Sequence, residues 1–230
     1  MNSHLQVIEK QIAACFNEEI MKTVLKIMAV LWVSTWASLA ATTEITPDVL
    51  VKSVTTEVIG IIKQDKDIQS GQTKKILDLV EAKVLPNFNF NRMTRLAVGK
   101  NWSKASPEEQ QQLTKQFRTL LVRTYSNALS GYRDQTIEVK PVQIGASDVD
   151  AVVKTQVIQS GGQQPVTIDY SMEKSEQGWK VYDVTVAGVS LVTNYRSSFN
   201  TEVRDGGIEG LIKTLSEKNR KLETGQKGNG

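Results

Sequence analysis

The chain has 230 residues, 40% of them hydrophobic and 23% charged, which is an ordinary globular composition and excludes disorder along the whole chain. Its 28 Lys and Arg residues exceed its 25 Asp and Glu residues by only three, so a nucleic-acid binder that relies on phosphate contacts is not indicated. The one Cys and the one His lie near the start of the chain, at Cys15 and His4.

The first 40 residues predict an exported protein. Residues 21–40 have the order of a signal peptide: two lysines come first, an apolar run follows at 27–39, and the small residues Ser38 and Ala40 end it. We expect cleavage after Ala40. A membrane anchor is the alternative, but polar residues cut the run short of the roughly 20 apolar residues that a spanning helix needs.

Residues 1–20 form a doubtful extension in front of this signal peptide. Met21 is itself a natural start, so a wrongly chosen start codon is one explanation. The other is an amphipathic helix, because apolar residues recur at helical spacing as Leu5, Ile8, Ile12 and Phe16. A signal peptide needs a nearly free N-terminus, which favours the first explanation.

The segment from residue 41 to residue 230 contains neither His nor Cys. This excludes from it His-assisted nucleophilic catalysis, thiol chemistry, disulfides and zinc sites built from Cys and His. It also leaves no Cys that a lipid could modify after the signal peptide. An exported chain without disulfides has to be held by a hydrophobic core, which a segment of this length can supply.

Helical spacing dominates the first part of this segment. Proline after Thr46 and after Ser106 marks two helix starts, the second of them a capping box completed by Glu109. Pro86 and Gly99 mark two helix ends. Helices are therefore expected over 47–62, 76–85, 91–98 and 107–131, the last being the longest.

After Arg133 the apolar period changes from about 3.6 residues to 2, which predicts strands. We expect strands at 136–142, 149–160, 165–174 and 179–187, the last three forming an antiparallel meander through glycine-containing turns. In the third strand apolar residues alternate with polar ones, so one face of the sheet is expected to be buried.

Helical spacing returns over 191–203 and 208–222, on either side of Gly206 and Gly207, and the tail over 224–230 is expected to be disordered. The predicted fold class is therefore α+β, with an antiparallel sheet of about four strands between N-terminal and C-terminal helices.

Several strings are specific when taken together. They are LPNFNF at 85–90, MTRLAVG at 93–99 followed by Trp102, FRTLLVRTY at 117–125, WKVYDV at 179–184, GVSLV at 188–192 and NYR at 194–196. In this combination the chain resembles the toluene-tolerance family of periplasmic phospholipid-binding proteins, the MlaC-like carriers of Gram-negative bacteria. The resemblance runs from about residue 45 to residue 222, and it indicates one phospholipid-binding domain over 41–223.

The resemblance implies a curved sheet related to the cone-shaped NTF2-like fold, packed against N-terminal and C-terminal helices that close a hydrophobic cavity holding the acyl chains of a phospholipid. It implies a periplasmic carrier that maintains outer-membrane lipid asymmetry, with bound phospholipid and no other cofactor. The implied partners are an inner-membrane ABC transporter complex and an outer-membrane lipoprotein complex, with transient membrane contact and no nucleic acid. The headgroup preference, the number of acyl chains, the direction of transport and the oligomeric state stay open.

Apolar positions on the longest helix, the sheet and the turn after the sheet are the candidate lipid-binding residues. They are Phe117, Leu121, Tyr125, Val153, Val157, Ile168, Tyr170, Val184, Val189 and Val192. Ordinary core packing is the alternative for each of them. Arg92, Arg95 and Arg196 are the candidates for the headgroup or the entrance, with ion pairs to neighbouring carboxylates as their alternative.

Three patterns suggest other chemistry, and none predicts it strongly. Ser190 follows a glycine as in a nucleophile elbow, but the closing glycine and a His are missing. Asp183 with Tyr170 could abstract a proton in an NTF2-like isomerase or hydratase, and a non-enzymatic interaction module is a further alternative. Asp148 and Asp150 have no further ligands near them in the sequence, so no metal site is predicted. We therefore predict no enzyme and no catalytic residue.

Overall fold

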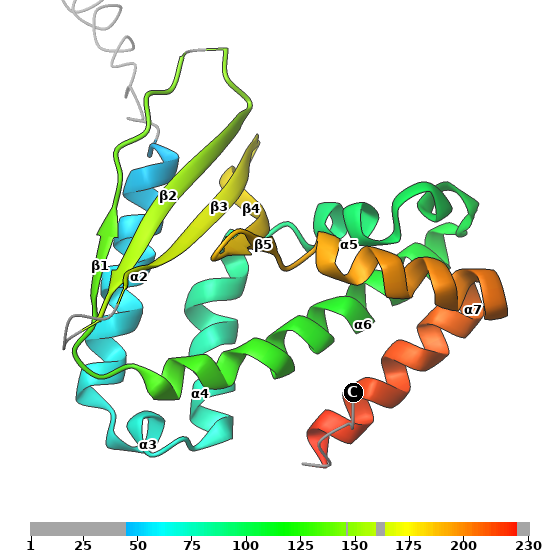
Figure 1. The fold of residues 1–230 in the computed structure, drawn as a ribbon, viewed down its shortest axis with the longest axis horizontal. Coiled ribbons are helices and arrows are strands. Elements are labelled where there is room, and N and C mark those ends of the chain that lie inside the picture. The colour runs from blue at the N-terminus through cyan, green and yellow to red at the C-terminus, as the bar shows by residue number, and fades with distance from the viewer. Residues whose placement is uncertain (1–44, 146, 160–163, 225–230) are drawn as a thin grey trace, which may run out of the picture. The chain divides into compact units, whose positions relative to one another are not determined.

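The computed structural model describes residues 45–145, 147–159 and 164–224. The expected extension at 1–20, the expected signal peptide at 21–40 and residues 225–230 of the expected tail lie outside the described residues. The described part has the predicted α+β class, in which an antiparallel sheet packs against helices that precede it in the sequence, and the helix that follows the sheet packs on two of those helices (Figure 1).

The N-terminal helices begin and end close to the predicted residues. Helix α2 (Pro47–Gln64) starts with proline in its first turn, where the missing N–H costs no hydrogen bond. The short helix α3 (Lys66–Gln69) follows, and the Asp65 carboxylate caps it by accepting from two backbone N–H groups. Helix α4 (Thr73–Leu79) continues into a π-helical turn, Val80–Val84, and a 3₁₀ turn, Leu85–Asn87, as the chain reaches Pro86.

Two further helices precede the sheet. Helix α5 (Phe90–Val98) is capped by the Asn89 side chain and ends at Gly99, whose φ of 62° favours glycine. Helix α6 (Pro107–Tyr125) opens with the predicted capping box. It ends earlier than predicted, because the chain tightens into a 3₁₀ segment, Ser126–Gly131.

The sheet has five antiparallel strands in sequence order. They are β1 (Thr136–Val139), β2 (Asp150–Ile158), β3 (Val166–Ser175), β4 (Gly178–Val186) and β5 (Val189–Ser190). The four predicted strands are present, and the two-residue β5 is an addition. A register shift between Ser171 and Met172 marks a bulge in the pairing of β3 with β4, and a bulge bends a strand locally.

Helix α7 (Arg196–Glu223) closes the described chain. The two helices predicted over 191–203 and 208–222 form this one element, with a kink at Gly207, where φ is 68°. The helix begins later than predicted because β5 and a 3₁₀ turn, Thr193–Tyr195, take up the residues before it.

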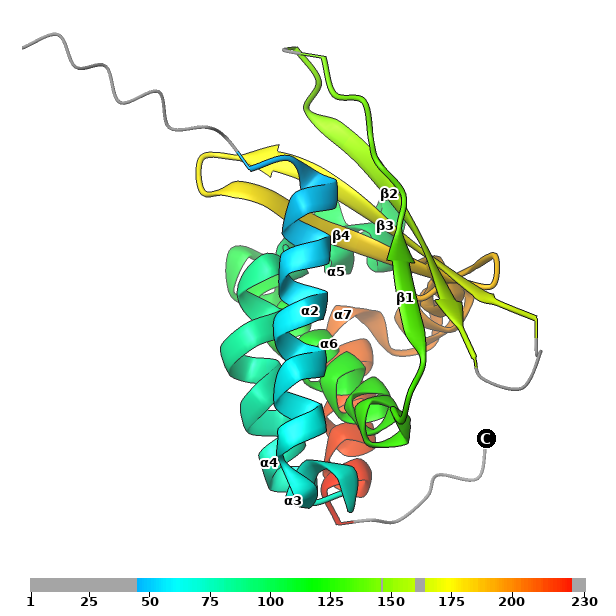
Figure 2. The same cartoon turned by 90° about the vertical axis from the view of Figure 1, so that its left-hand side faces the viewer.

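Helices cover one face of the sheet. Helix α2 runs beside β1 along that face, whereas α5, α6 and α7 pack together at the other end of the unit (Figures 1 and 2). The core has three clusters: one among α5, α6 and α7, one between α2 and the sheet, and one among α2, α3 and α4. No helix in the described part of the chain has both the length and the apolar character needed to cross a membrane.

Candidate functional site

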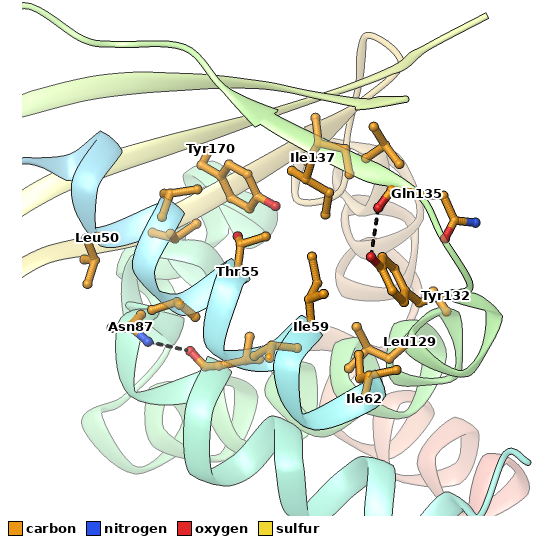
Figure 3. A pocket seen from close by; sticks show the side chains of 18 of the residues that line it. Leu50, Thr55, Ile59, Ile62, Asn87, Leu129, Tyr132, Gln135, Ile137 and Tyr170 are labelled. Carbon is orange, nitrogen blue, oxygen red and sulfur yellow. Dashed lines mark hydrogen bonds between the residues drawn. The ribbon is translucent and has the colours of Figure 1, made fainter. Parts of the chain in front are cut away.

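A cavity of about 410 Å³ lies between α2 and the sheet, and we call it the main cavity (Figure 3). Helix α2 lines one side of it and strands β1 to β4 line the other. Its residues are Leu50, Val51, Val54, Thr55, Val58, Ile59, Ile62, Val84, Asn87, Phe88, Ala128, Leu129, Gly131, Tyr132, Gln135, Ile137, Val157, Gln159, Ile168, Tyr170, Met172 and Val181. Its volume lies within the range of about 300–1,000 Å³ that is typical of ligand cavities.

A second, smaller cavity of about 190 Å³ adjoins the main cavity, and we call it the side cavity. It lies among α5, α6, the turns after α4, and β4, and it shares Val84, Phe88 and Leu129 with the main cavity. Among the described residues, none that lines either cavity is charged. Such surroundings suit hydrocarbon and exclude an ion, because an unpaired charge is costly there.

Six of the ten predicted lipid-binding residues line one of these cavities. Val157, Ile168 and Tyr170 line the main cavity. Leu121, Tyr125 and Val184 line the side cavity. The sheet and the longest helix therefore contribute to different cavities, which the sequence did not indicate.

The other four predicted residues line neither cavity. Phe117, Val153 and Val192 are completely buried and belong to the core clusters. Val189 is 56% exposed and lies in β5, the short strand at one edge of the sheet.

Most of the lining of the main cavity was not among the predicted residues. Helix α2 supplies the largest missed group, including Leu50, Val54 and Ile59. Its apolar stripe was visible in the sequence, but an ordinary buried helix has the same stripe. Tyr132, which follows the 3₁₀ segment after α6, and Ile137 in β1 were also missed, although a strand was expected at Ile137.

The three predicted headgroup arginines line neither cavity. Arg196 donates from Nε and Nη2 to the carbonyl oxygen of Leu96, at 3.1 and 2.9 Å. Arg95 is exposed on α5. Neither residue lines a cavity.

Arg92 is instead the centre of a polar cluster that joins α5 to the sheet. Its guanidinium contacts Glu173 at 2.5 Å and Asp150 at 2.9 Å, and it lies 3.6 Å from the ring centre of Tyr182. Asn89 also donates to Glu173, at 2.5 Å. The two carboxylates raise the pKa of Arg92 against the opposing effect of burial. Ion pairing and stacking therefore explain this arginine.

Replacing Arg92 by Ala is expected to lower the free energy of unfolding by about 1–3 kcal/mol, because Glu173 is left half-buried with fewer donors. Bound phospholipid should be retained. Urea unfolding and lipid extraction measure the two quantities, and Arg95→Ala on the same helix is the matched control, with an expected change below about 0.5 kcal/mol. If Arg92→Ala loses lipid while its stability is unchanged, Arg92 contributes to the headgroup site at the entrance.

The alternative enzyme site does not form. Asp183 accepts hydrogen bonds from the backbone N–H of Val184, the hydroxyl of Ser190 and the backbone N–H of Val192. These bonds stabilise the turn around β5. In the register of β3 and β4, Asp183 pairs with Ser171, whereas Tyr170 pairs with the cavity-lining Val184. Side chains alternate between the faces of a strand, so Asp183 and Tyr170 are not brought together for proton abstraction.

The acidic pair at the start of β2 is also explained by local contacts. Asp150 pairs with Arg92 at 2.9 Å, and Asp148 accepts from the backbone N–H of Gly145 at 2.8 Å. Within the described ranges, no group of three or more His, Cys, Asp or Glu residues is placed to hold a metal ion.

Comparison with known proteins gives consistent matches. The family model described as MlaC protein matches residues 52–217. The intermembrane phospholipid transport system binding protein MlaC of Haemophilus influenzae is 25% identical over 159 residues, covering 66% of this chain and 74% of that protein. The toluene tolerance protein Ttg2D of Pseudomonas putida is 27% identical over 171 residues, covering 74% and 78%.

A solved structure is similar over the same region. It is the phospholipid-binding protein of Ralstonia solanacearum in complex with a phospholipid, which is 40% identical to this chain. The two structures superpose with a TM-score of 0.70, covering 76% of this chain and 98% of that chain.

Proposed function

The chain belongs to the MlaC family, and from this membership and the two uncharged cavities we propose that it carries a phospholipid between the inner and outer membranes. The observation that supports the proposal most directly is the main cavity, which opens an apolar space between α2 and the sheet. A similar protein of known structure holds a phospholipid.

The physical need for a carrier follows from the cost of exposing acyl chains. A phospholipid with two chains has roughly 30 methylenes, each costing about 0.8 kcal/mol in water, so its transfer through water costs on the order of 20 kcal/mol. A cavity that hides the chains removes this cost. A bilayer hides them equally well, so the carrier alone cannot set the direction of transport.

Transport in one direction therefore needs a partner that supplies energy. The sequence has no Walker-type phosphate loop. The partners we propose are an inner-membrane ABC transporter complex and an outer-membrane lipoprotein complex, with the periplasm as the compartment and outer-membrane lipid asymmetry as the result. The intermembrane transport system named for the Haemophilus relative supports this assignment. The family consists of lipid-binding transport proteins and not of enzymes.

Protein purified from the periplasm is expected to carry phospholipid in a fixed ratio. Native mass spectrometry should give the mass of the chain plus whole phospholipids, and organic extraction should release the same lipids. An empty protein, after purification without detergent, would contradict the carrier and favour an interaction module with a filled core.

A further inference from the structure

Two hydroxyl groups face the main cavity from opposite walls. Tyr170 extends into it from β3 and Thr55 from α2 (Figure 3). Neither hydroxyl makes a hydrogen bond with any residue that the structure describes. Tyr132 in the same cavity differs, because its hydroxyl donates to the carbonyl oxygen of Gln135 at 2.8 Å.

The Thr55 hydroxyl does not make the hydrogen bond within its own helix that several other helical threonines of this chain make. A helical threonine can donate to the carbonyl oxygen four residues earlier. Thr56 does so in the same helix at 2.8 Å, and so do Thr94, Thr114 and Thr119 in α5 and α6, at 2.7–3.0 Å. The Thr55 hydroxyl therefore remains available to a bound molecule.

These hydroxyls limit which part of a lipid can lie beside them. A polar group removed from water without a hydrogen bond costs several kcal/mol, and methylenes cannot provide that bond. Burial raises the pKa of Tyr170, so its hydroxyl stays protonated and able to donate. The acceptors nearest to the acyl chains of a glycerophospholipid are its two ester carbonyl oxygens.

A polar groove adjoins the cavity at the same place. Helix α2 and strand β1 run side by side (Figure 2). The groove between them has a volume of about 410 Å³. The groove shares Thr55, Ile59 and Ile137 with the main cavity. Its outer part is lined by Lys52, Thr56, Glu138, Val139, Lys140 and Pro141.

The charges of this groove suit a lipid phosphate. Lys140 pairs with Glu138 at 2.8 Å, whereas Lys52 forms no ion pair with any described residue. The net charge of the three groups is therefore positive. The described lining residues of the main and side cavities include no charged side chain. In the groove, by contrast, the phosphate of a lipid can stay in water and near a lysine while its esters lie beside Tyr170 and Thr55.

We propose that Tyr170 and Thr55 hold the ester carbonyls of the bound lipid, and that its headgroup leaves the protein through the groove between α2 and β1. This inference rests on the proposed carrier function and adds the orientation of the lipid. It also makes Tyr170 a residue that selects lipids by their linkage. A lipid with two ether linkages has no carbonyl oxygen to accept the hydrogen bond.

Competition between a diester phosphatidylcholine and its diether analogue tests the ester contact. The wild-type protein is expected to retain the diester about three- to tenfold better, which is the effect of about one hydrogen bond. Tyr170→Phe should reduce this ratio to near one. Tyr132→Phe should keep the wild-type ratio, whatever its retention of each lipid, because the Tyr132 hydroxyl already has a backbone partner.

A wild-type ratio of one, or a ratio that Tyr170→Phe leaves unchanged, would overturn the ester contact while leaving the carrier function intact. A protein that retains neither lipid would overturn the carrier function and this inference together.

A phosphatidylcholine with a nitroxide on its headgroup tests the exit. Broadening of backbone amide NMR signals should be strongest at residues 52–56 and 137–140. Broadening centred on Gln135 and Gln159 would instead place the headgroup at the other polar part of the cavity wall and overturn the proposed exit.

Discussion

Replacing Ile168 by Glu is expected to give a folded protein that no longer retains phospholipid. Ile168 is half-buried and lines the main cavity, so water can enter and solvate the carboxylate when no lipid is present. A bound acyl chain would exclude that water and leave the charge unpaired at a cost of several kcal/mol. Retention should therefore fall by about a hundredfold or more. Lipid extraction and circular dichroism measure the two effects.

Val153→Glu is the matched control on the neighbouring strand. Val153 is completely buried, packs in the cluster between α2 and the sheet, and lines neither cavity. A carboxylate there has no water and no partner, and the cost is large beside a total stability of about 5–15 kcal/mol. This variant should not fold.

The contrast between these two variants decides whether the main cavity holds lipid. If Ile168→Glu also unfolds the protein, its position is dry core and the main cavity is not open to water. If Ile168→Glu folds and retains lipid normally, the acyl chains lie elsewhere. Val184→Glu applies the same test to the side cavity.

Helix boundaries were predictable where one residue type satisfies a backbone requirement. Pro47 and Pro107 occupy first helical turns, and Ser106 with Glu109 forms both hydrogen bonds of the capping box. Gly99 ends α5 with a positive φ. These signals are local, so they do not depend on the tertiary structure.

Elements without a repeated pattern could not be predicted in the same way. The strand β5 has two residues, which is too short to show alternation. Its pairing with β4 depends on the turn that Asp183 braces, and that turn takes up residues predicted as the start of the last helix. By contrast, the break expected between two helices at Gly206 and Gly207 is present, because the backbone at Gly207 is not helical and the two halves of α7 run in different directions (Figure 1).

The site was harder to predict than the fold because a cavity and a dry core use the same residue types. Val153 and Val157 lie on the same face of β2, yet only Val157 lines the main cavity. Alternation along the strand identifies the face and not the space beyond it. The ion pair of Arg92 with Glu173 could not be predicted either, since the two residues are 81 positions apart in the sequence.

Phe117→Ala is expected to lower the stability of the protein and to keep its lipid binding. These effects are the opposite of those expected for Ile168→Glu. Phe117 is completely buried and lines neither cavity. Its ring meets the rings of Tyr195 and Phe199 edge-on, with both centroid distances at 5.2 Å, and so joins α6 to the start of α7. Removing the ring leaves a hole that the surrounding helices cannot fill.

The expected loss is about 3–5 kcal/mol in the free energy of unfolding, measured by urea titration of the delipidated protein. In the absence of urea, the folded fraction of the Phe117→Ala protein should still retain phospholipid, since both cavities keep their lining residues. Tyr125→Ala is the control two turns further along α6: Tyr125 is 37% exposed and lines the side cavity, so its loss should reduce stability less and lipid retention more. If Phe117→Ala instead loses lipid with little change in stability, the aromatic cluster contributes to the lipid site and the division of α6 into core and cavity residues is wrong.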